Sequence, residues 1–379
     1  MLIPRPFLIL FGKKISSFTI FGALGVFTSI ITTFYLTTFL HLSLLVWLIM
    51  TITGIAVLFS LAELMKRIKG TPVLVYYHHE FAIISFITIF LFFTERRHIL
   101  EYLDITAAGL GIVLAFGRIG CFMAGCCHGK PSNYGIHYHK GHAEMGFPYY
   151  YLETPLFPVQ IIEACGVLLI VIFMIFSILN RVQAGTAFAF YILCYGLLRF
   201  LLEFARGDIS RPYYGPLSEA QWFSVILSSL IIIMTFIGGI PGIPRHVAII
   251  AMFCCFLVFL FLIGKSNKPW LKIKHSQIRE LAILVNELDN VKSSFLRLRV
   301  GKNTILVTAG ILRVENATIK HFTVSMYPNV EVSWLDCIGN LLYLLQNRSG
   351  VLTKLNKTAS MMHFIIKSQS HPLVPNVII

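Results

Sequence analysis

Long apolar runs separated by short polar breaks occupy the first two thirds of the chain. A membrane-spanning helix needs about 20 mostly apolar residues. The stretches that qualify are residues 15–39, 42–62, 73–93, 103–124, 157–179, 185–205, 221–240 and 246–264. The 103–124 run is the weakest because Asp104 and Arg118 interrupt it. This pattern predicts an all-α polytopic membrane bundle of eight transmembrane helices, or of seven if Pro241 and Pro244 mark a re-entrant hairpin.

The last part of the chain follows a different pattern. From residue 265 to 379 the apolar runs are short, and apolar positions in Gln277–Lys292 recur at helical spacing. Apolar and polar residues alternate in Thr304–Val314 and Phe322–Trp334, which predicts strands. We therefore expect two domains: a transmembrane domain over 1–264 and a small soluble α/β-type appendage after it.

The composition excludes an ordinary soluble globule. Only 13% of the residues are charged and 56% are hydrophobic, whereas soluble domains are about 25% charged. The net charge is +14, and residues 265–379 hold 15 basic against 6 acidic residues, or +9 of it. On a membrane protein this excess predicts contact between the appendage and anionic headgroups. No compact nucleic-acid-binding motif accompanies it, so nucleic acid is not an expected partner.

The eight cysteines lie mostly in apolar runs and do not resemble a secreted disulfide framework. Cys121, Cys126, Cys127 and His128 match none of the usual zinc spacings, so we predict no metal site. Cys126, Cys127 and His128 lie at the start of the segment 125–156, which is rich in Gly, His, Pro and Tyr. Loops of this length in compact proteins are often functional. The apolar run after Lys14 is too long for a signal-peptide core and lacks a small-residue cleavage site, which indicates a retained first span.

Charged residues inside spans are functional candidates because insertion into lipid makes them costly. Arg118 stands between Gly117 and Gly120 near the end of the fourth predicted span. Glycines let backbone or a ligand approach closely, and one arginine can offer several N–H donors to a phosphate. The alternative is an arginine that extends to the membrane interface.

A second charged group lies in the sixth predicted span. Arg199, Glu203 and Arg206 follow each other at i, i+4 and i+7, which places them on one helix face within pairing distance. The row predicts either a structural set of ion pairs that locks helices together, or an anion clamp with one arginine left for a ligand. The sequence favours neither.

Smaller signals lie at the starts of two other spans. His78 and His79 open the third predicted span, where a histidine could act as a general base or pack at the interface. Gln160 and Glu163 open the fifth at membrane depth, which implies internal partners for both.

Together these residues resemble the prolipoprotein diacylglyceryl transferase family over about residues 15–240. Gly117–Phe122 matches that family's Gly-Arg-x-Gly-Asn-Phe signature except at Cys121, and Pro158–Glu163 resembles its Pro-x-Gln-x-x-Glu segment. Tyr195–Asp208 resembles its Tyr-Gly-x-x-Arg-Phe-x-x-Glu-Phe-x-Arg run. The positions of Asp104, His78 and Gln221 also correspond to polar residues of the family.

The resemblance implies transfer of a diacylglyceryl group from phosphatidylglycerol to the lipobox cysteine of a prolipoprotein, without a cofactor. Arg118 and Arg199 would stabilise the leaving glycerol phosphate, and Glu203 would orient Arg199. Arg206 would complete the row, and His78 would take the thiol proton. The other residues assigned to substrate binding by resemblance are Gly117, Gly120, Cys121, Gln160, Glu163, Tyr195 and Gln221.

The chain departs from the family at several polar positions. Cys121 replaces an Asn, Cys126 stands where a polar residue is expected, and Phe21 replaces a Tyr. His79 and Glu80 replace two glycines after the histidine. A non-catalytic lipid-binding relative is therefore an alternative. An anion transporter would require paired half-motifs in an internal repeat, and the sequence has no such repeat.

Family membership also implies an orientation in a bacterial cytoplasmic membrane. The N-terminus and the active site would face the extracytoplasmic side. Arg96 and Arg97 agree with this orientation under the positive-inside tendency, whereas Lys66, Arg67 and Lys69 oppose it. We give the motif order more weight, because arginines that belong to a site distort such counts.

Overall fold

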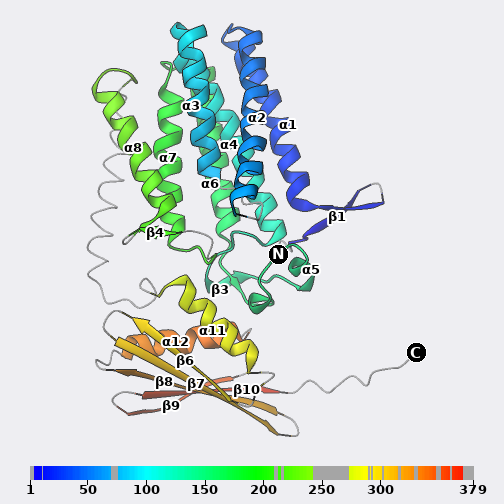
Figure 1. Ribbon diagram of the computed structural model, residues 1–379, viewed down its shortest axis with the longest axis vertical. Coiled ribbons are helices and arrows are strands. Elements are labelled where there is room, and N and C mark those ends of the chain that lie inside the picture. Colours follow the sequence, from blue (N-terminus) through cyan, green and yellow to red (C-terminus); the bar gives the residue numbers. More distant parts are fainter. Residues whose placement is uncertain are drawn as a thin grey trace.

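A computed structural model shows a bundle of long helices whose one end is covered by a looped segment and by a sheet with two further helices (Figure 1). It describes residues 4–10, 12–69, 76–208, 212–214, 217–241, 273–288, 291, 293–300, 303–314, 317–327, 332–346, 351–358 and 361–369. All structural statements below refer to these residues.

Seven described helices are long and apolar enough to cross a membrane. They are α1 (Ser17–Phe39), α2 (Leu44–Lys69), α3 (Tyr76–Thr94), α4 (Ile99–Ala124), α6 (Val159–Leu179), α7 (Thr186–Glu203) and α8 (Glu219–Phe236). They confirm the predicted membrane bundle. Most ends differ from the expected ones by at most four residues, but α2 continues to Lys69, seven residues beyond the expected end at 62. The eighth expected span, 246–264, and Pro244 lie outside the described residues.

The run that seemed weakest from its charges forms a central helix. Helix α4 packs against α1, α6 and α7. The buried carboxylate of Asp104 accepts hydrogen bonds from the backbone N–H groups of Gly185 at 2.8 Å and Phe188 at 2.7 Å. Because these are among the N–H groups left unpaired at the start of a helix, Asp104 caps α7. Its charge therefore has a structural role at the end of α4 far from Arg118.

Short elements surround the other end of the bundle, where α1, α3, α6 and α8 begin and α2, α4 and α7 end (Figure 1). A hairpin of β1 (Phe7–Leu10) and β2 (Lys13–Ser16) precedes α1. The 125–156 segment contains β3 (Pro131–Ile136), α5 (Lys140–Ala143) and η2 (Tyr149–Tyr151). The remaining short elements are η1 (Arg96–His98), which lies at the opposite end, β4 (Tyr213–Tyr214) and β5 (Leu217–Ser218).

The C-terminal region is a five-stranded antiparallel sheet in the order β6-β7-β8-β10-β9. Its strands are β6 (Ser293–Val300), β7 (Asn303–Val314), β8 (Ala317–Tyr327), β9 (Val351–Thr358) and β10 (Met361–Gln369). Helices α11 (His275–Glu287) and α12 (Val332–Leu345) cover one face. Gly339 on α12 leaves room for the Phe364 ring of β10, because a Cβ there would overlap that ring.

The sequence-based elements of this region are partly corrected. Helix α11 begins two residues before the expected start at Gln277, and β7 matches the strand expected at 304–314. The strand expected over Phe322–Trp334 ends at Tyr327, and Trp334 belongs to α12. Buried Trp334, Ile338 and Leu341 recur at helical spacing, so the last part of that prediction was wrong.

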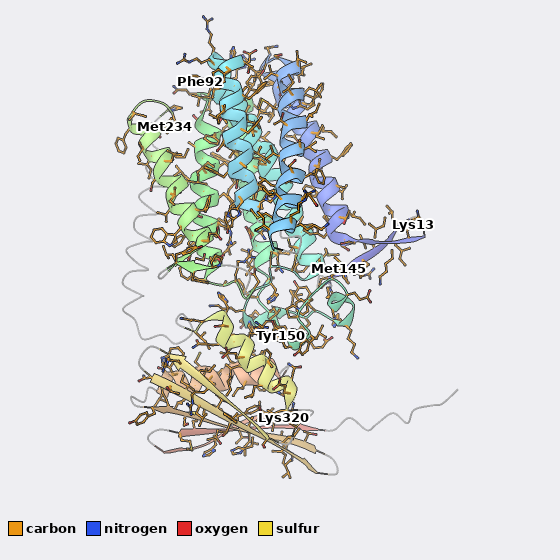
Figure 2. The ribbon with its side chains drawn as sticks, in the orientation of Figure 1. Lys13, Phe92, Met145, Tyr150, Met234 and Lys320 are labelled. Atoms are coloured by element: carbon orange, nitrogen blue, oxygen red, sulfur yellow. The ribbon has the colours of Figure 1, made fainter. Side chains whose placement is uncertain are left out.

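The C-terminal region shares a hydrophobic core with the 125–156 segment. Tyr138, Phe147 and Tyr151 of the segment join the buried side chains of α11, α12 and the sheet. The Asn286 side chain also donates a hydrogen bond to the Tyr150 carbonyl at 3.1 Å. Figure 2 places Tyr150 between bundle and sheet, with Phe92 and Met234 at the far end. The sheet region is thus seated on the bundle end that carries Arg118; its contact with headgroups stays a prediction.

Candidate functional site

Buried charged residues from three helices meet at the covered end of the bundle. Arg118 of α4 contacts Glu163 of α6 with Nε 2.9 Å from Oε2. Arg199 of α7 approaches the other oxygen of the same carboxylate, with Nε 3.9 Å from Oε1. The Glu163 side chain is fully buried, and the two arginine side chains are 7% and 3% exposed. One carboxylate therefore bridges two arginines that belong to different helices.

The row continues along α7 and beyond its end. Arg199 Nη2 lies 2.6 Å from Glu203 Oε2, and Arg206 Nε lies 3.9 Å from the same oxygen. Arg206 also donates two hydrogen bonds to Asp208, at 2.8 and 2.9 Å. The i, i+4, i+7 spacing thus forms the predicted ion-pair row. Anion binding by that row stays a prediction.

The arginines keep donor capacity beyond these ion pairs. Each guanidinium has five N–H donors. Within the described residues, Arg118 Nε, all three guanidinium nitrogens of Arg199 and Arg206 Nη1 are buried without an aligned hydrogen bond. The close contacts to Glu163 and Glu203 are therefore charge pairs whose angles are not those of hydrogen bonds. Of these nitrogens, Arg199 Nη1 and Arg206 Nη1 take part in none of the ion pairs and hydrogen bonds given above, so these two donors are left for a further acceptor. Binding of a phosphate there stays a prediction.

The glycines beside Arg118 have different surroundings. A Cβ at Gly117 would meet nothing within 4 Å, so the helix surface there is open. A Cβ at Gly120 would lie 3.1 Å from the Phe18 Cα and would push α1 away from α4. Gly117 therefore stands on an open part of the helix surface formed by the described residues, whereas Gly120 serves helix packing.

Three other predicted site residues use their polar atoms within the protein. The Tyr195 hydroxyl donates to Glu163 Oε1 at 3.3 Å. Gln160 Nε2 donates to the Cys126 carbonyl at 2.8 Å and to the Tyr138 hydroxyl at 3.3 Å, which fastens the start of α6 to the 125–156 segment. Gln221 forms a capping box with Ser218 at the start of α8. These contacts position the site, and direct contact with a substrate stays a prediction for all three.

His78 has a partner that the sequence analysis did not identify. Its Nε2 lies 2.8 Å from Glu219 Oε1, and each side chain is about one quarter exposed. Acidic residues are common in the first turn of a helix, so Glu219 gave no separate signal. His79 is 1% exposed and lines an apolar cavity between α1, α2, α3 and α4 together with Glu80. The two neighbouring histidines therefore face different surroundings.

Arg118, Arg199 and Arg206, with the carboxylates that pair with them, are called the arginine row below. Two more polar residues lie near its outer end at Arg206. Lys130 is buried, and this burial lowers its pKa to about 8. His275 comes from α11 of the C-terminal region and contacts the Tyr213 hydroxyl at 2.9 Å through Nε2. Burial, followed by the positive charge of Lys130, lowers the pKa of His275 to about 4. Sequence spacing could not reveal either residue, because they reach the row only through tertiary folding.

Comparison with known proteins identifies the same stretch of chain. A family model described as prolipoprotein diacylglyceryl transferase matches residues 78–237. Relatives named phosphatidylglycerol–prolipoprotein diacylglyceryl transferase occur in Clostridium tetani, 31% identical over 140 residues, and in Lactococcus lactis subsp. lactis, 33% identical over 144 residues. A relative in Clostridium perfringens, which has the same name followed by the number 2, is 30% identical over 136 residues.

The similarity is confined to part of each protein. The alignments cover 37%, 37% and 35% of this chain and 54%, 53% and 50% of the respective relatives, so the chain spans about half the length of the curated relatives it matches. No solved structure matches the chain. The matched stretch contains the arginine row, His78 and Glu219. The resemblance seen in the motifs is thereby confirmed for this part of the chain: residues 78–237 match the prolipoprotein diacylglyceryl transferase family.

Proposed function

We propose that this protein transfers the diacylglyceryl group of phosphatidylglycerol to the cysteine thiol of a prolipoprotein lipobox. The observation that supports this most directly is the buried bridge of Arg118, Glu163 and Arg199 at one end of the bundle. Its unaligned donors suit a phosphate at that depth. The relatives' names contain both substrates.

In the proposed reaction the thiol sulfur attacks the glyceryl carbon that carries the phosphate. A carbon–sulfur bond forms as the carbon–oxygen bond to the phosphate breaks, and glycerol phosphate leaves. Negative charge on that leaving group requires fixed donors in a site that excludes water. Arg118 and Arg199 supply these donors, and Glu203 orients Arg199 through their 2.6 Å contact. Arg206 extends the positive row toward the outer end.

His78 is the proposed acceptor of the thiol proton. Its contact with Glu219 favours the tautomer that carries the proton on Nε2. The other ring nitrogen, Nδ1, is buried and has no hydrogen-bond partner among the described residues. In that tautomer the Nδ1 lone pair is available to a proton, which is the arrangement of a general base oriented by a carboxylate.

We also infer that the arginine row faces the extracytoplasmic side of a bacterial cytoplasmic membrane. Arg96 and Arg97 lie at the opposite end of the bundle, as the positive-inside tendency requires. The orientation can be tested in intact cells with a membrane-impermeant thiol reagent and a single cysteine introduced at Lys140 or Arg97 in a chain whose eight native cysteines are replaced by Ser. Labelling at position 140 alone is expected, and labelling at position 97 alone would reverse the orientation.

The activity can be tested by a gel-shift assay with the purified chain and a lipobox peptide. Phosphatidylglycerol should retard the peptide, while phosphatidylcholine or a peptide with Ser in place of the lipobox Cys should not. Phosphatidylglycerol binding without any shift would contradict transfer. That result would support the non-catalytic lipid-binding alternative, which the replacement of the family Asn by Cys121 suggests.

A further inference from the structure

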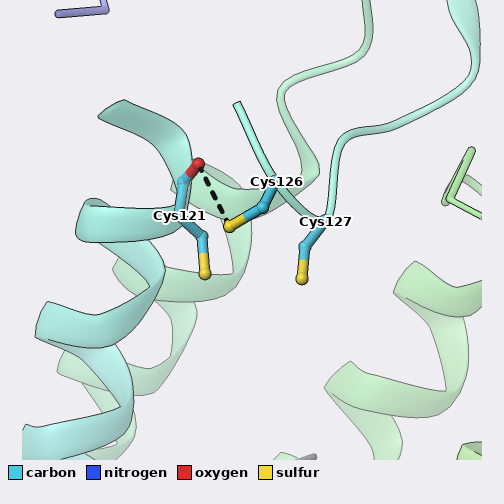
Figure 3. Close-up of side chains that lie close together, drawn as sticks. All are labelled: Cys121, Cys126 and Cys127. Atoms are coloured by element: carbon cyan, nitrogen blue, oxygen red, sulfur yellow. Dashed lines mark hydrogen bonds between the residues drawn. The ribbon is translucent and has the colours of Figure 1, made fainter. Parts of the chain in front are cut away.

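Three cysteines cluster where α4 ends. Cys121 is assigned to substrate binding only by resemblance, and no bond-making step of the proposed transfer uses any of the three sulfurs. Cys121 lies in the last turn of α4, and Cys126 and Cys127 follow it in the 125–156 segment. All three sulfur atoms lie within 4.8 Å of one another. Figure 3 shows the Cys126 side chain pointing toward Cys121, where its sulfur hydrogen-bonds the Cys121 carbonyl at 3.9 Å. Such a grouping cannot be read from the spacing of the residues, because it depends on the turn between them.

A tight turn brings the sulfurs together. Gly125 adopts a left-handed conformation with φ of 86° and donates its N–H to the Cys121 carbonyl at 2.9 Å. Cys127 is also left-handed, with φ of 56°, which is uncommon for a residue with a side chain. Gln160 holds the turn through its hydrogen bond to the Cys126 carbonyl. The backbone therefore adopts an unfavourable conformation at the residue that contributes one of the sulfurs.

The sulfur positions suit a thiophilic metal ion. Zinc–sulfur bonds are about 2.3 Å long, so the sulfurs around one ion are about 3.8–4.0 Å apart. Sulfurs already within 4.8 Å need only small side-chain adjustments to reach that separation. Thiolates select soft ions such as Cu(I) and Zn²⁺, whereas Mg²⁺ and Ca²⁺ prefer oxygen ligands. Cys121 is buried and Cys126 is exposed, so the cluster has both a sheltered ligand and access from outside.

The surrounding charges favour the same ligand set. Arg118 and Arg206 both lie close enough to Cys127 for their charges to interact with its sulfur. Three thiolates with one Zn²⁺ carry a net charge of −1, and with Cu(I) they carry −2. Neighbouring guanidinium groups can balance either charge at this depth, where an uncompensated charge would be costly.

We propose that Cys121, Cys126 and Cys127 form a three-thiolate site for a single soft metal ion, Cu(I) or Zn²⁺. Binding displaces the thiol protons to solvent and changes no oxidation state. The metal site shares Arg118 with the proposed transfer site. Metal binding is measured by absorption and proton release rather than by transfer, so metal binding and transfer can succeed or fail separately.

The test uses the full-length protein in detergent, reduced with a phosphine. In one variant the other five cysteines, Cys165, Cys194, Cys254, Cys255 and Cys337, are replaced by Ser. Titration with Co²⁺ as a spectroscopic probe, and with Cu(I) against a coloured chelator, should show one ion per chain. Thiolate-to-cobalt charge-transfer absorption and release of up to about three protons per ion are expected. The matched variant, with only Cys121, Cys126 and Cys127 replaced by Ser, should show neither.

A single substitution separates metal binding from folding. Cys126→Ser changes an exposed side chain and should leave the folded protein intact. It should weaken binding by at least about 100-fold, since loss of a neighbour that merely orients a ligand already costs about 10–100-fold. The proposal is overturned if the variant that keeps only Cys121, Cys126 and Cys127 has three free, reactive thiols but shows no charge-transfer absorption. It is also overturned if those thiols form a disulfide under reducing conditions, or if the variant lacking the cluster binds equally well.

Discussion

Replacing Glu163 with Gln tests the electrostatic core of the site. Glu163→Gln keeps the size of the side chain and removes the charge that bridges Arg118 and Arg199. Both arginines are then buried beside each other without their common counter-ion. The variant should therefore be less stable than the parent. It should also gain more stability than the parent from any ligand that supplies a negative charge at this position.

The distances set the size of the effect. At an effective dielectric constant of 20, unit charges attract by about 6 kcal/mol at the 2.9 Å separation of Arg118 and Glu163. The same estimate is about 4 kcal/mol at the 3.9 Å separation of Arg199 and Glu163. Desolvation offsets much of this attraction, and loss of one partner from a buried pair typically costs about 3–5 kcal/mol. We expect a loss near the upper end, because one carboxylate serves two arginines.

The assay is thermal unfolding in a zwitterionic detergent with and without phosphatidylglycerol. A ligand that binds only the folded state stabilises it more the more tightly it binds, so Glu163→Gln should regain more stability from the lipid than the parent does. Asp104→Asn is the matched control, because it alters a buried carboxylate that bonds backbone N–H groups rather than arginines. Unchanged stability of Glu163→Gln, or equal lipid stabilisation of the two variants, would refute the reasoning.

Three further outcomes are expected. Arg118→Lys should reduce the transfer rate about 10²-fold, because an ammonium cannot replace a planar guanidinium. The rate is measured by single-turnover kinetics, and a rate equal to the parent's would contradict this prediction. His78→Gln should slow transfer about 10²-fold because the proposed general base is lost, and His79→Gln should keep the parent rate; the reverse pattern would assign the base to His79. Lys130→Met should stabilise the protein by about 3 kcal/mol at pH 7, because the pKa of Lys130 falls from 10.5 to about 8 on folding. The parent, but not this variant, should gain stability as the pH rises from about 8 to 10.5; exposed Lys140→Met is the control, and equal curves would contradict the burial of a charged lysine.

The membrane bundle could be predicted because apolar length alone determines which segments cross lipid. The charges that weakened the 103–124 run are satisfied internally: Asp104 caps α7 and Arg118 pairs with Glu163. Neither partnership is visible in a local window. The row of Arg199, Glu203 and Arg206 was predictable because a single helix and its end fix their spacing.

Features that depend on distant segments could not be predicted. Glu219 pairs with His78 across 141 positions of sequence, and His275 reaches the arginine row through the docking of α11. The three cysteines converge only because Gly125 and Cys127 are both left-handed. In the C-terminal region, the alternating pattern up to Trp334 predicted a strand where α12 begins. The packing of α12 against the sheet shows that its first residues are helical.

The most direct test of the central claim compares single-turnover transfer by the parent, Arg118→Ala and Arg199→Ala proteins, with phosphatidylglycerol and a lipobox peptide as substrates. Arg67→Ala is the matched control, since Arg67 is 77% exposed. The arginine row is predicted to make each of the first two variants about 10²–10³-fold slower, while Arg67→Ala keeps the parent rate. Full transfer rates in both Arg118→Ala and Arg199→Ala would contradict the proposed role of the row in stabilising the leaving phosphate.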